Sequence, residues 1–308
     1  MSWTLDAMPD QTGRTALVTG ATSGLGLASA TALAARGARV LLTARDPDRG
    51  SAALAHVRAV GGPRAELVEL DLADLASVRR ATAVVRERTG DVLDVLLNNA
   101  GVMATPAAVT VDGFELQIAT NHLGHAALTW LLMPALRAAP AARVVTVSSI
   151  AHRGGGLDVD DLHFTRRPYR PATAYSQSKL ANLLFAAELD RRLRAAGHPV
   201  VSVAAHPGIT GTDLLQNSLR RRSPLLAAVS DPVNRLFTQS VRTGVLPQLY
   251  AATAPQVRGG DYVGPRGPGE VVGRPAPARR SAAARDPELA RRLWDVTATA
   301  TGVRPDPA

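Results

Sequence analysis

The chain contains no cysteine in its 308 residues. This absence excludes disulfide bonds, thiolate catalysis and zinc or iron–sulfur sites built on cysteine. Histidine offers no substitute, because the seven histidines form no His-Glu-x-x-His pattern, and His122 and His125 have no third ligand nearby in the sequence. We therefore expect no bound metal.

Aromatic residues are scarce as well, at 4% of the chain. The formal charge of +9 would suit a nucleic-acid partner, but the arginines are spread along the sequence. Only residues 220–222 form a tight arginine cluster, which is typical of a solvated loop. Because so few aromatic side chains could stack on bases, we expect no nucleic-acid partner.

Long hydrophobic runs are missing too. The longest, residues 126–136, is too short to cross a bilayer. Asp6 and Asp10 interrupt the N-terminal stretch where a signal peptide needs an apolar core. The hydrophobic content of 46% is nevertheless ample for a core. We expect a protein without a membrane span, located in the cytoplasm.

A glycine-rich turn follows the first predicted strand. Residues 15–19 predict a strand, residues 20–26 read Gly-Ala-Thr-Ser-Gly-Leu-Gly, and residues 27–36 have a helical pattern. Strand, glycine turn and helix together are the context of a dinucleotide-binding loop. Small residues let the backbone approach a pyrophosphate, and the free N–H groups at the start of the helix receive its charge.

The residue after the second predicted strand, 39–43, indicates which dinucleotide binds. In such βαβ units this position meets the adenosine ribose, and an acidic side chain there would repel a 2′-phosphate. Arg45 stands at this point and favours NADP(H), with NAD(H) as the second choice. The alternative is that Arg45 is an ordinary surface residue and Asp46 takes the ribose hydroxyl.

Helices and strands continue to alternate along the chain. Helical patterns cover residues 48–60 and 74–88, and strands are predicted at 65–70, 92–98, 143–147 and 200–205. Asp71 follows the third strand and could either reach the adenine amino group or cap the next helix, two interpretations that the sequence leaves equally open. After the fourth strand we expect Asn98 to serve the turn, and Asn99 and Gly101 to line the cofactor.

A long amphipathic stretch at 112–137 contains Asn121 and Gly124, which both disfavour a helix interior. A local distortion that exposes backbone carbonyls to an ordered water is one way to compensate. The fifth strand then ends at Ser148 and Ser149, and because successive strand residues face opposite sides, only one of these hydroxyls can face a nicotinamide.

Tyr175 and Lys179 lie four positions apart in a helix-patterned run, so they share one face of the helix. A phenol titrates near 10, and an adjacent cation lowers that pKa toward working pH, which makes tyrosine a general acid/base. Of the 35 basic residues, 34 are arginine and only Lys179 is lysine. This exception indicates that the site requires a compact ammonium group.

The remaining segments surround this helix. Residues 150–173 form an insertion rich in glycine, proline and charge, and residues 209–240 are apolar and interrupted, equally consistent with a substrate lid and with ordinary core. A helix near 239–253, a Gly/Pro/Arg-rich segment at 257–280 and a helix at 287–299 complete the chain. No linker divides it, so residues 1–308 predict one doubly wound α/β domain, with residues 264–308 as a C-terminal extension.

The motifs, in this order, resemble the short-chain dehydrogenase/reductase family over residues 14–263. They are Thr19-Gly-x-x-x-Gly-x-Gly26, Asn98-Asn-Ala-Gly101, Asn121, Ser149, Tyr175-x-x-x-Lys179 and Pro207-Gly208. The resemblance implies a Rossmann-like, seven-stranded parallel sheet. It also implies that Tyr175 exchanges a proton with the carbinol oxygen, that Ser149 orients this oxygen, that Lys179 binds the nicotinamide ribose and lowers the tyrosine pKa, and that Asn121 holds a relay water.

One departure narrows the resemblance to a subgroup. Ser149 and Tyr175 are 26 positions apart, about twice the spacing usual in the family, because of the insertion. Retinol dehydrogenase-like members are similar in this insertion and in the Ser-Lys-Leu-Ala-Asn run at 178–182. The cofactor-binding residues expected from the chain and the resemblance together are Gly20, Thr22, Ser23, Gly24, Leu25, Gly26, Arg45, Asp71, Leu72, Asn99, Ala100, Gly101, Tyr175, Lys179, Pro207, Gly208, Thr210 and Thr212.

The expected function is an NADP(H)-preferring oxidoreductase that moves hydride between nicotinamide and a lipophilic alcohol, ketone or aldehyde. A nonenzymatic NADP(H) sensor is the first alternative, although such proteins commonly lose the tyrosine or lysine kept here. A nucleotide-sugar epimerase is the second, but it resembles a different glycine spacing. Family members often pair through the helices near 112–137 and 174–195, so a homodimer or homotetramer is also expected.

Overall fold

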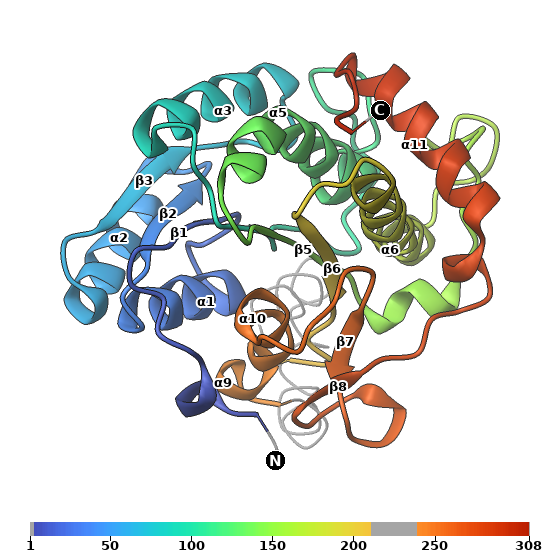
Figure 1. The fold of residues 1–308 in the computed structure, drawn as a ribbon. Helices are drawn as coiled ribbons and strands as arrows, with labels where there is room; N and C mark the ends of the chain where they lie inside the picture. Colours follow the sequence, from blue (N-terminus) through green and yellow to red (C-terminus); the bar gives the residue numbers. More distant parts are fainter. Residues whose placement is uncertain (1–2, 211–238, 308) are drawn as a thin grey trace, which may run out of the picture.

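The computed structural model describes residues 3–210 and 239–307, and within them one twisted sheet has eight strands (Figure 1). Its order is β3-β2-β1-β4-β5-β6-β7-β8. The strands are β1 (Thr15–Val18), β2 (Arg39–Ala44), β3 (Ala65–Glu69), β4 (Val95–Asn98), β5 (Arg143–Val147), β6 (Val201–Ala205), β7 (Tyr262–Pro265) and β8 (Pro275–Pro277). The strand order reverses between β1 and β4, which places the ligand crevice of a doubly wound fold at their carboxyl ends.

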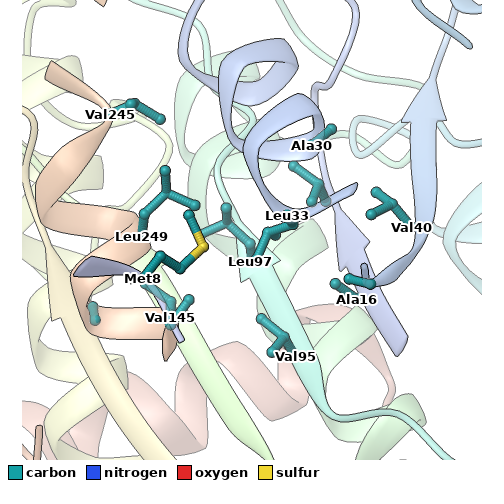
Figure 2. Packing of buried hydrophobic residues seen from close by; sticks show 14 of the residues in the cluster. Met8, Ala16, Ala30, Leu33, Val40, Val95, Leu97, Val145, Val245 and Leu249 are labelled. Carbon is teal, nitrogen blue, oxygen red and sulfur yellow. The ribbon is translucent and has the colours of Figure 1, made fainter. Parts of the chain in front are cut away.

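Helices cover both faces of the sheet and confirm a single α/β domain. On one face lie α1 (Gly24–Ala35), α2 (Pro47–Gly61), α9 (Val241–Gly244) and α10 (Leu246–Thr253), and on the other α3 (Leu75–Thr89), α5 (Gly124–Ala138) and α6 (Pro171–Ala195). Each layer has its own apolar core. In Figure 2, Leu33 of α1, Leu97 of β4 and Leu249 of α10 pack within the first of these.

The Gly/Pro/Arg-rich segment contains two strands that the hydrophobic pattern misses. β7 pairs with β6 in parallel, whereas β8 runs antiparallel to β7, so the expected seven parallel strands are present and an eighth, antiparallel strand corrects the count. β7 reads Tyr-Val-Gly-Pro and β8 reads Pro-Ala-Pro, compositions typical of loops. Backbone pairing with a neighbouring strand, which no local pattern records, makes them strands.

The stretch predicted as one amphipathic helix is broken at the expected place. A short α4 (Leu116–Ile118) leads into a π-helical turn, η2 (Ala119–Leu123), before α5 begins at Gly124. A methyl group on Gly124 would lie 2.3 Å from the carbonyl oxygen of Leu72. Glycine is therefore required for the close approach of α5 to the segment after β3. The helix near 239–253 is likewise two helices, α9 and α10, with Pro247 in the first turn of the second.

The last helix, α11 (Pro287–Thr301), packs against α5 and α6 (Figure 1). The ring of Trp294 lies 4.8 Å from that of Trp130 and 5.5 Å from that of Phe185, and all three rings are buried. α11 thus covers part of the two helices through which a second subunit was expected to pair.

The insertion between β5 and α6 has little regular structure. It opens with a 3₁₀ turn, η3 (Ile150–Gly154), and ends where α6 begins at Pro171. Most of the expected lid, residues 211–238, lies outside the described residues, and so does Thr212. No helix in the described ranges is long and apolar enough to span a membrane.

Candidate active site

The glycine turn after β1 is shaped by contacts that only glycine permits. Gly20 has φ +64, and a methyl group on Gly26 would lie 2.2 Å from the carbonyl oxygen of Gly20 and 2.6 Å from Nδ2 of Asn99. Within the described chain, Ser23 forms no side-chain cap at the start of α1. The first N–H groups of α1 therefore face this turn without a capping side chain, as a pyrophosphate site requires.

Thr19 joins this turn to the end of β4. Its hydroxyl accepts hydrogen bonds from the backbone N–H groups of Asn99, at 2.9 Å, and Ala100, at 3.0 Å. Asn99 Nδ2 donates to the Thr19 carbonyl at 2.8 Å, and its Oδ1 accepts from Gln248 Nε2 of α10 at 3.2 Å. The Asn99 side chain therefore braces the turn. Thr19 is therefore a site residue that the sequence does not single out, although it heads the glycine motif.

Asn98 plays a different part from the turn role expected of it. It is the last residue of β4, it is buried, and its Nδ2 donates to Thr129 Oγ1 of α5 at 3.0 Å. Because side chains alternate along a strand, Asn98 points into the sheet face while Asn99 follows at the edge. The turn prediction for Asn98 is wrong for this reason.

Arg45 stands just beyond the carboxyl end of β2 and is exposed. Its guanidinium has no partner within residues 3–210 and 239–307. The neighbouring Asp46 instead caps α2, its Oδ1 accepting from the N–H groups of Asp48 at 3.0 Å and Arg49 at 3.1 Å. The carboxylate that could take a ribose hydroxyl thus already caps the helix.

Asp71 lies beyond β3, half-buried, and its Oδ1 accepts from the N–H of Ala73 at 2.9 Å. The helix cap is a different residue, Asp74, which accepts from the N–H of Ala76 at 2.8 Å. The interpretation of Asp71 as the cap of α3 is therefore wrong. Its contact with adenine stays a prediction.

The catalytic candidates meet at the carboxyl ends of β4 and β5. Lys179 is buried, its Nζ donating to the Val147 carbonyl at 3.1 Å and lying 5.7 Å from the centre of the Tyr175 ring. A methyl group on Gly101 would lie 3.1 Å from Asn121 Oδ1 and 3.5 Å from Lys179 Nζ. The segment after β4, the turn η2 and the helix α6 are thus brought together at one point.

The two serines after β5 face opposite ways, as strand alternation predicts. Ser148 is buried and its hydroxyl donates to the Lys179 carbonyl at 2.7 Å. Ser149 is half-buried, accepts from the N–H of Ala151 at 3.2 Å, and shares a hydrogen bond with the Tyr175 phenol. Ser149, the serine expected to act, is the one beside the tyrosine.

Burial controls the ionisation of the pair. It raises the pKa of Tyr175 to about 12, although the hydrogen bond with Ser149 acts in the opposite direction. Burial also lowers the pKa of Lys179 to about 8. That Lys179 lowers the Tyr175 pKa stays a prediction, because in the free protein burial sets the direction of the shift and the hydrogen bond with Ser149 opposes it. At neutral pH the phenol holds its proton and most of the lysine is charged.

Asn121 is fixed on both sides of its amide. Its Oδ1 accepts from the N–H of Val102 at 2.8 Å, and its Nδ2 donates to the Val102 carbonyl and the Ser178 hydroxyl, both at 2.9 Å. The Asn121 carbonyl lies 3.0 Å from Nδ1 of His125, whose pKa burial lowers to about 4. His125 is thus a neutral partner of the π-helical turn. The relay water expected at Asn121 stays a prediction. Separately, no cluster of three metal-binding side chains occurs in the described residues.

The turn after β6 brings the last cofactor candidates to the same edge of the sheet. Gly208 donates its N–H to Nδ1 of His206 at 3.2 Å, and Ile209 donates to the Val271 carbonyl at 2.9 Å. Thr210 is buried and bridges to Gln239. The segment between β7 and β8 therefore fixes the turn that contains Pro207, Gly208 and Thr210.

Known proteins share this arrangement. The family model described as "short chain dehydrogenase" matches residues 14–223. Polyprenol dehydrogenase of Mus musculus is 43% identical over 294 residues, which cover 93% of this chain and 83% of that protein. Retinol dehydrogenase 13 of Homo sapiens is 39% identical over 292 residues, covering 94% and 85%.

Two solved structures extend the comparison. An uncharacterized protein from Mycobacterium paratuberculosis is 44% identical, with a TM-score of 0.82 and coverage of 99% of both chains. A complex of Pseudomonas aeruginosa RhlG with NADP is 26% identical, with a TM-score of 0.62, covering 82% of this chain and 94% of that one. Both are similar to this chain in fold.

Proposed function

This chain belongs to the short chain dehydrogenase family, and within it to the retinol dehydrogenase-like subgroup. We propose that it is an NADP(H)-preferring oxidoreductase that interconverts a lipophilic alcohol and the corresponding ketone or aldehyde. The relatives named as polyprenol and retinol dehydrogenases support an alcohol of this kind. A cytoplasmic location stays a prediction.

The observation that carries the proposal is the meeting of Ser149, Tyr175 and Lys179 beside the glycine turn. A hydroxyl hydrogen-bonded to the phenol and an ammonium 5.7 Å from its ring stand where β4 and β5 end. The residues around them fit a dinucleotide, since Gly26 packs so closely on Gly20 that a methyl group there would lie 2.2 Å from the Gly20 carbonyl oxygen, and this contact permits the tight turn at the start of α1. The uncapped start of α1 suits a pyrophosphate.

In the proposed mechanism the chain's own residues position the substrate and move a proton. NADP(H), when bound, supplies the hydride. The Ser149 hydroxyl hydrogen-bonds the substrate oxygen, and Tyr175 Oη donates its proton to that oxygen in reduction or removes it in oxidation. With its pKa raised to about 12 by burial, the free tyrosine is set as the proton donor. Lys179, fixed by the Val147 carbonyl, holds the ribose of the cofactor.

The preference for NADP(H) rests on Arg45. Arg45 is exposed just beyond the carboxyl end of β2, the position that meets the adenosine ribose in such folds, while Asp46 caps α2. An arginine binds phosphate oxygens bidentately, and each such charged hydrogen bond contributes about 1.5–3 kcal/mol. The similar structure that contains NADP supports the same cofactor.

The test is a carbonyl panel assayed with NADPH and with NADH. Lipophilic ketones and aldehydes, retinal-like and isoprenoid aldehydes among them, are mixed with the full chain while the absorbance of the reduced nicotinamide is followed. We expect turnover with NADPH and a kcat/KM ratio for NADPH over NADH that falls about tenfold or more in Arg45→Asp, a loss equivalent to about 1.4 kcal/mol.

Arg49→Asp is the matched control, since it makes the same change of charge at an exposed arginine in the first turn of α2. No turnover with any carbonyl would refute the oxidoreductase. An unchanged cofactor ratio in Arg45→Asp would refute the preference for NADP(H) while leaving the reaction intact.

A further inference from the structure

We propose that Glu270, in the C-terminal extension, is a positioning residue of this site: its carboxylate joins the segment after Ser149 to the Pro207–Gly208 turn. The proposal rests on the proposed function, because it assigns a role to a residue that supports the same site. Glu270 touches neither Tyr175 nor Ser149, and it acts through Arg153 and His206.

The carboxylate of Glu270 is nearly enclosed and makes contacts in three directions. Its Oε2 accepts from Arg153 Nη2 at 2.5 Å and lies 3.2 Å from Nε2 of His206, and its Oε1 accepts from the N–H of Arg279 at 2.9 Å. The side chain is 13% exposed and that of His206 is 0% exposed. A charge-paired carboxylate this deep is costly to leave with a partner missing.

His206 links Glu270 to the Pro207–Gly208 turn. Nδ1 of His206 accepts from the N–H of Gly208, so in the neutral ring Nε2 carries the proton and donates to Glu270. A methyl group on Gly264 of β7 would lie 2.0 Å from this Nε2, so the ring has no room to turn. Through His206, Glu270 therefore fixes the position of the Pro207–Gly208 turn.

Arg153 links Glu270 to the segment that follows Ser149. Arg153 is the fourth residue after Ser149, and its Nη2 also donates to the Arg279 carbonyl at 3.3 Å. Between them, His152 is fully buried and accepts from the N–H of Ser281 at its Nε2, so its Nδ1 carries the proton and donates to the Ser149 carbonyl at 2.7 Å. The strand tip that bears Ser149 is thus anchored twice to the segment around Glu270.

The backbone at Glu270 is held in a conformation that its side chain alone does not favour. Glu270 has φ +62, in the left-handed region, directly after Gly269, also at φ +62. A residue other than glycine is strained in this region and is retained where the surroundings require it. Here the conformation aims the carboxylate at the segments that follow the neighbouring strands β5 and β6.

The test measures NADPH binding and kinetics in Glu270→Ala, Glu270→Gln and Arg153→Ala, with Glu288→Gln as control. Glu288 is an exposed carboxylate of α11 that pairs with Arg291 on the surface. NADPH fluorescence titration gives Kd without turnover, and initial rates give KM and kcat. In Glu270→Ala we expect Kd and KM for NADPH to rise about tenfold, and kcat to fall about 10- to 100-fold. Glu270→Gln keeps one accepting oxygen and should lie between the alanine variant and the wild type.

KM and Kd distinguish positioning from simple stabilisation, because a loss of folded protein lowers the apparent kcat but changes neither constant. Values of Kd and KM in all three variants equal to those of Glu288→Gln would overturn the proposal. If Glu270→Ala does not fold, Glu270→Gln and Arg153→Ala carry the same test. Failure of the proposed function gives a different result, a wild-type chain that neither binds NADPH nor reduces any carbonyl.

Discussion

Replacing Lys179 by methionine should change how the stability of the free protein depends on pH. Lys179 is 4% exposed, and burial lowers its pKa from the ordinary 10.5 to about 8. The unfolded chain therefore binds more protons than the folded one between pH 8 and 10.5. Across that window the contribution of Lys179 to the free energy of unfolding rises with pH.

The size of the effect follows from the shift in the lysine pKa. At about 1.4 kcal/mol for each pKa unit, a fall from 10.5 to about 8 corresponds to about 3 kcal/mol. Below pH 8 the wild type bears this whole cost of a buried cation, and above pH 10.5 it bears none. Lys179→Met bears none at any pH, so its stability relative to the wild type should fall by about 3 kcal/mol from pH 8 to pH 10.5.

The assay is urea unfolding of both proteins at intervals from pH 7 to pH 10.5, without cofactor. Lost packing and the lost bond to the Val147 carbonyl shift the difference between the two proteins by a constant amount. The other titrating side chains are the same in both proteins. Because Lys179 is the only lysine in the sequence, no other lysine side chain contributes to the comparison. A difference that stays flat from pH 8 to pH 10.5 would refute the claim that burial destabilises the charged amine.

Two further predictions concern the serine pair and the assembly. Ser149→Ala should lower kcat by about 100-fold or more, since it removes a donor to the reacting oxygen. Ser148→Ala should leave KM unchanged and cost about 1–3 kcal/mol of stability, because the Lys179 carbonyl loses its buried donor; equal kinetic losses in both variants would contradict the assignment. Because α11 covers part of α5 and α6, light scattering should give the 32.2 kDa mass of a monomer, and a mass of twice that value would contradict it.

Local patterns predict the fold well where an element buries a regular face. β5 is found at the predicted residues, 143–147, and the helix that carries Tyr175 begins three residues before its predicted start. The pattern fails at β7 and β8, whose glycine and proline residues suggest loops, because pairing across the sheet makes them strands. The π-helical turn could be anticipated, since Asn121 and Gly124 are poor helix formers in an otherwise regular stretch.

The site could be predicted in its members but not in its energetics. Chain order and spacing identify Ser149, Tyr175 and Lys179, which the fold brings together. The sequence gives no measure of burial, so it predicts a lowered pKa for Tyr175 where desolvation raises it. Nor does any local motif indicate Glu270, because its partners come from segments far apart in the chain.

The central claim is that Tyr175 is the proton donor and acceptor of a nicotinamide-dependent reaction, and Tyr175→Phe tests it most directly. The measurement is the rate of NADPH oxidation with the best carbonyl of the panel, beside the Kd for NADPH from fluorescence titration. Removing the phenolic proton should lower kcat by about 100- to 10,000-fold while Kd changes little. Turnover equal to that of the wild type, at equal Kd, would contradict the account.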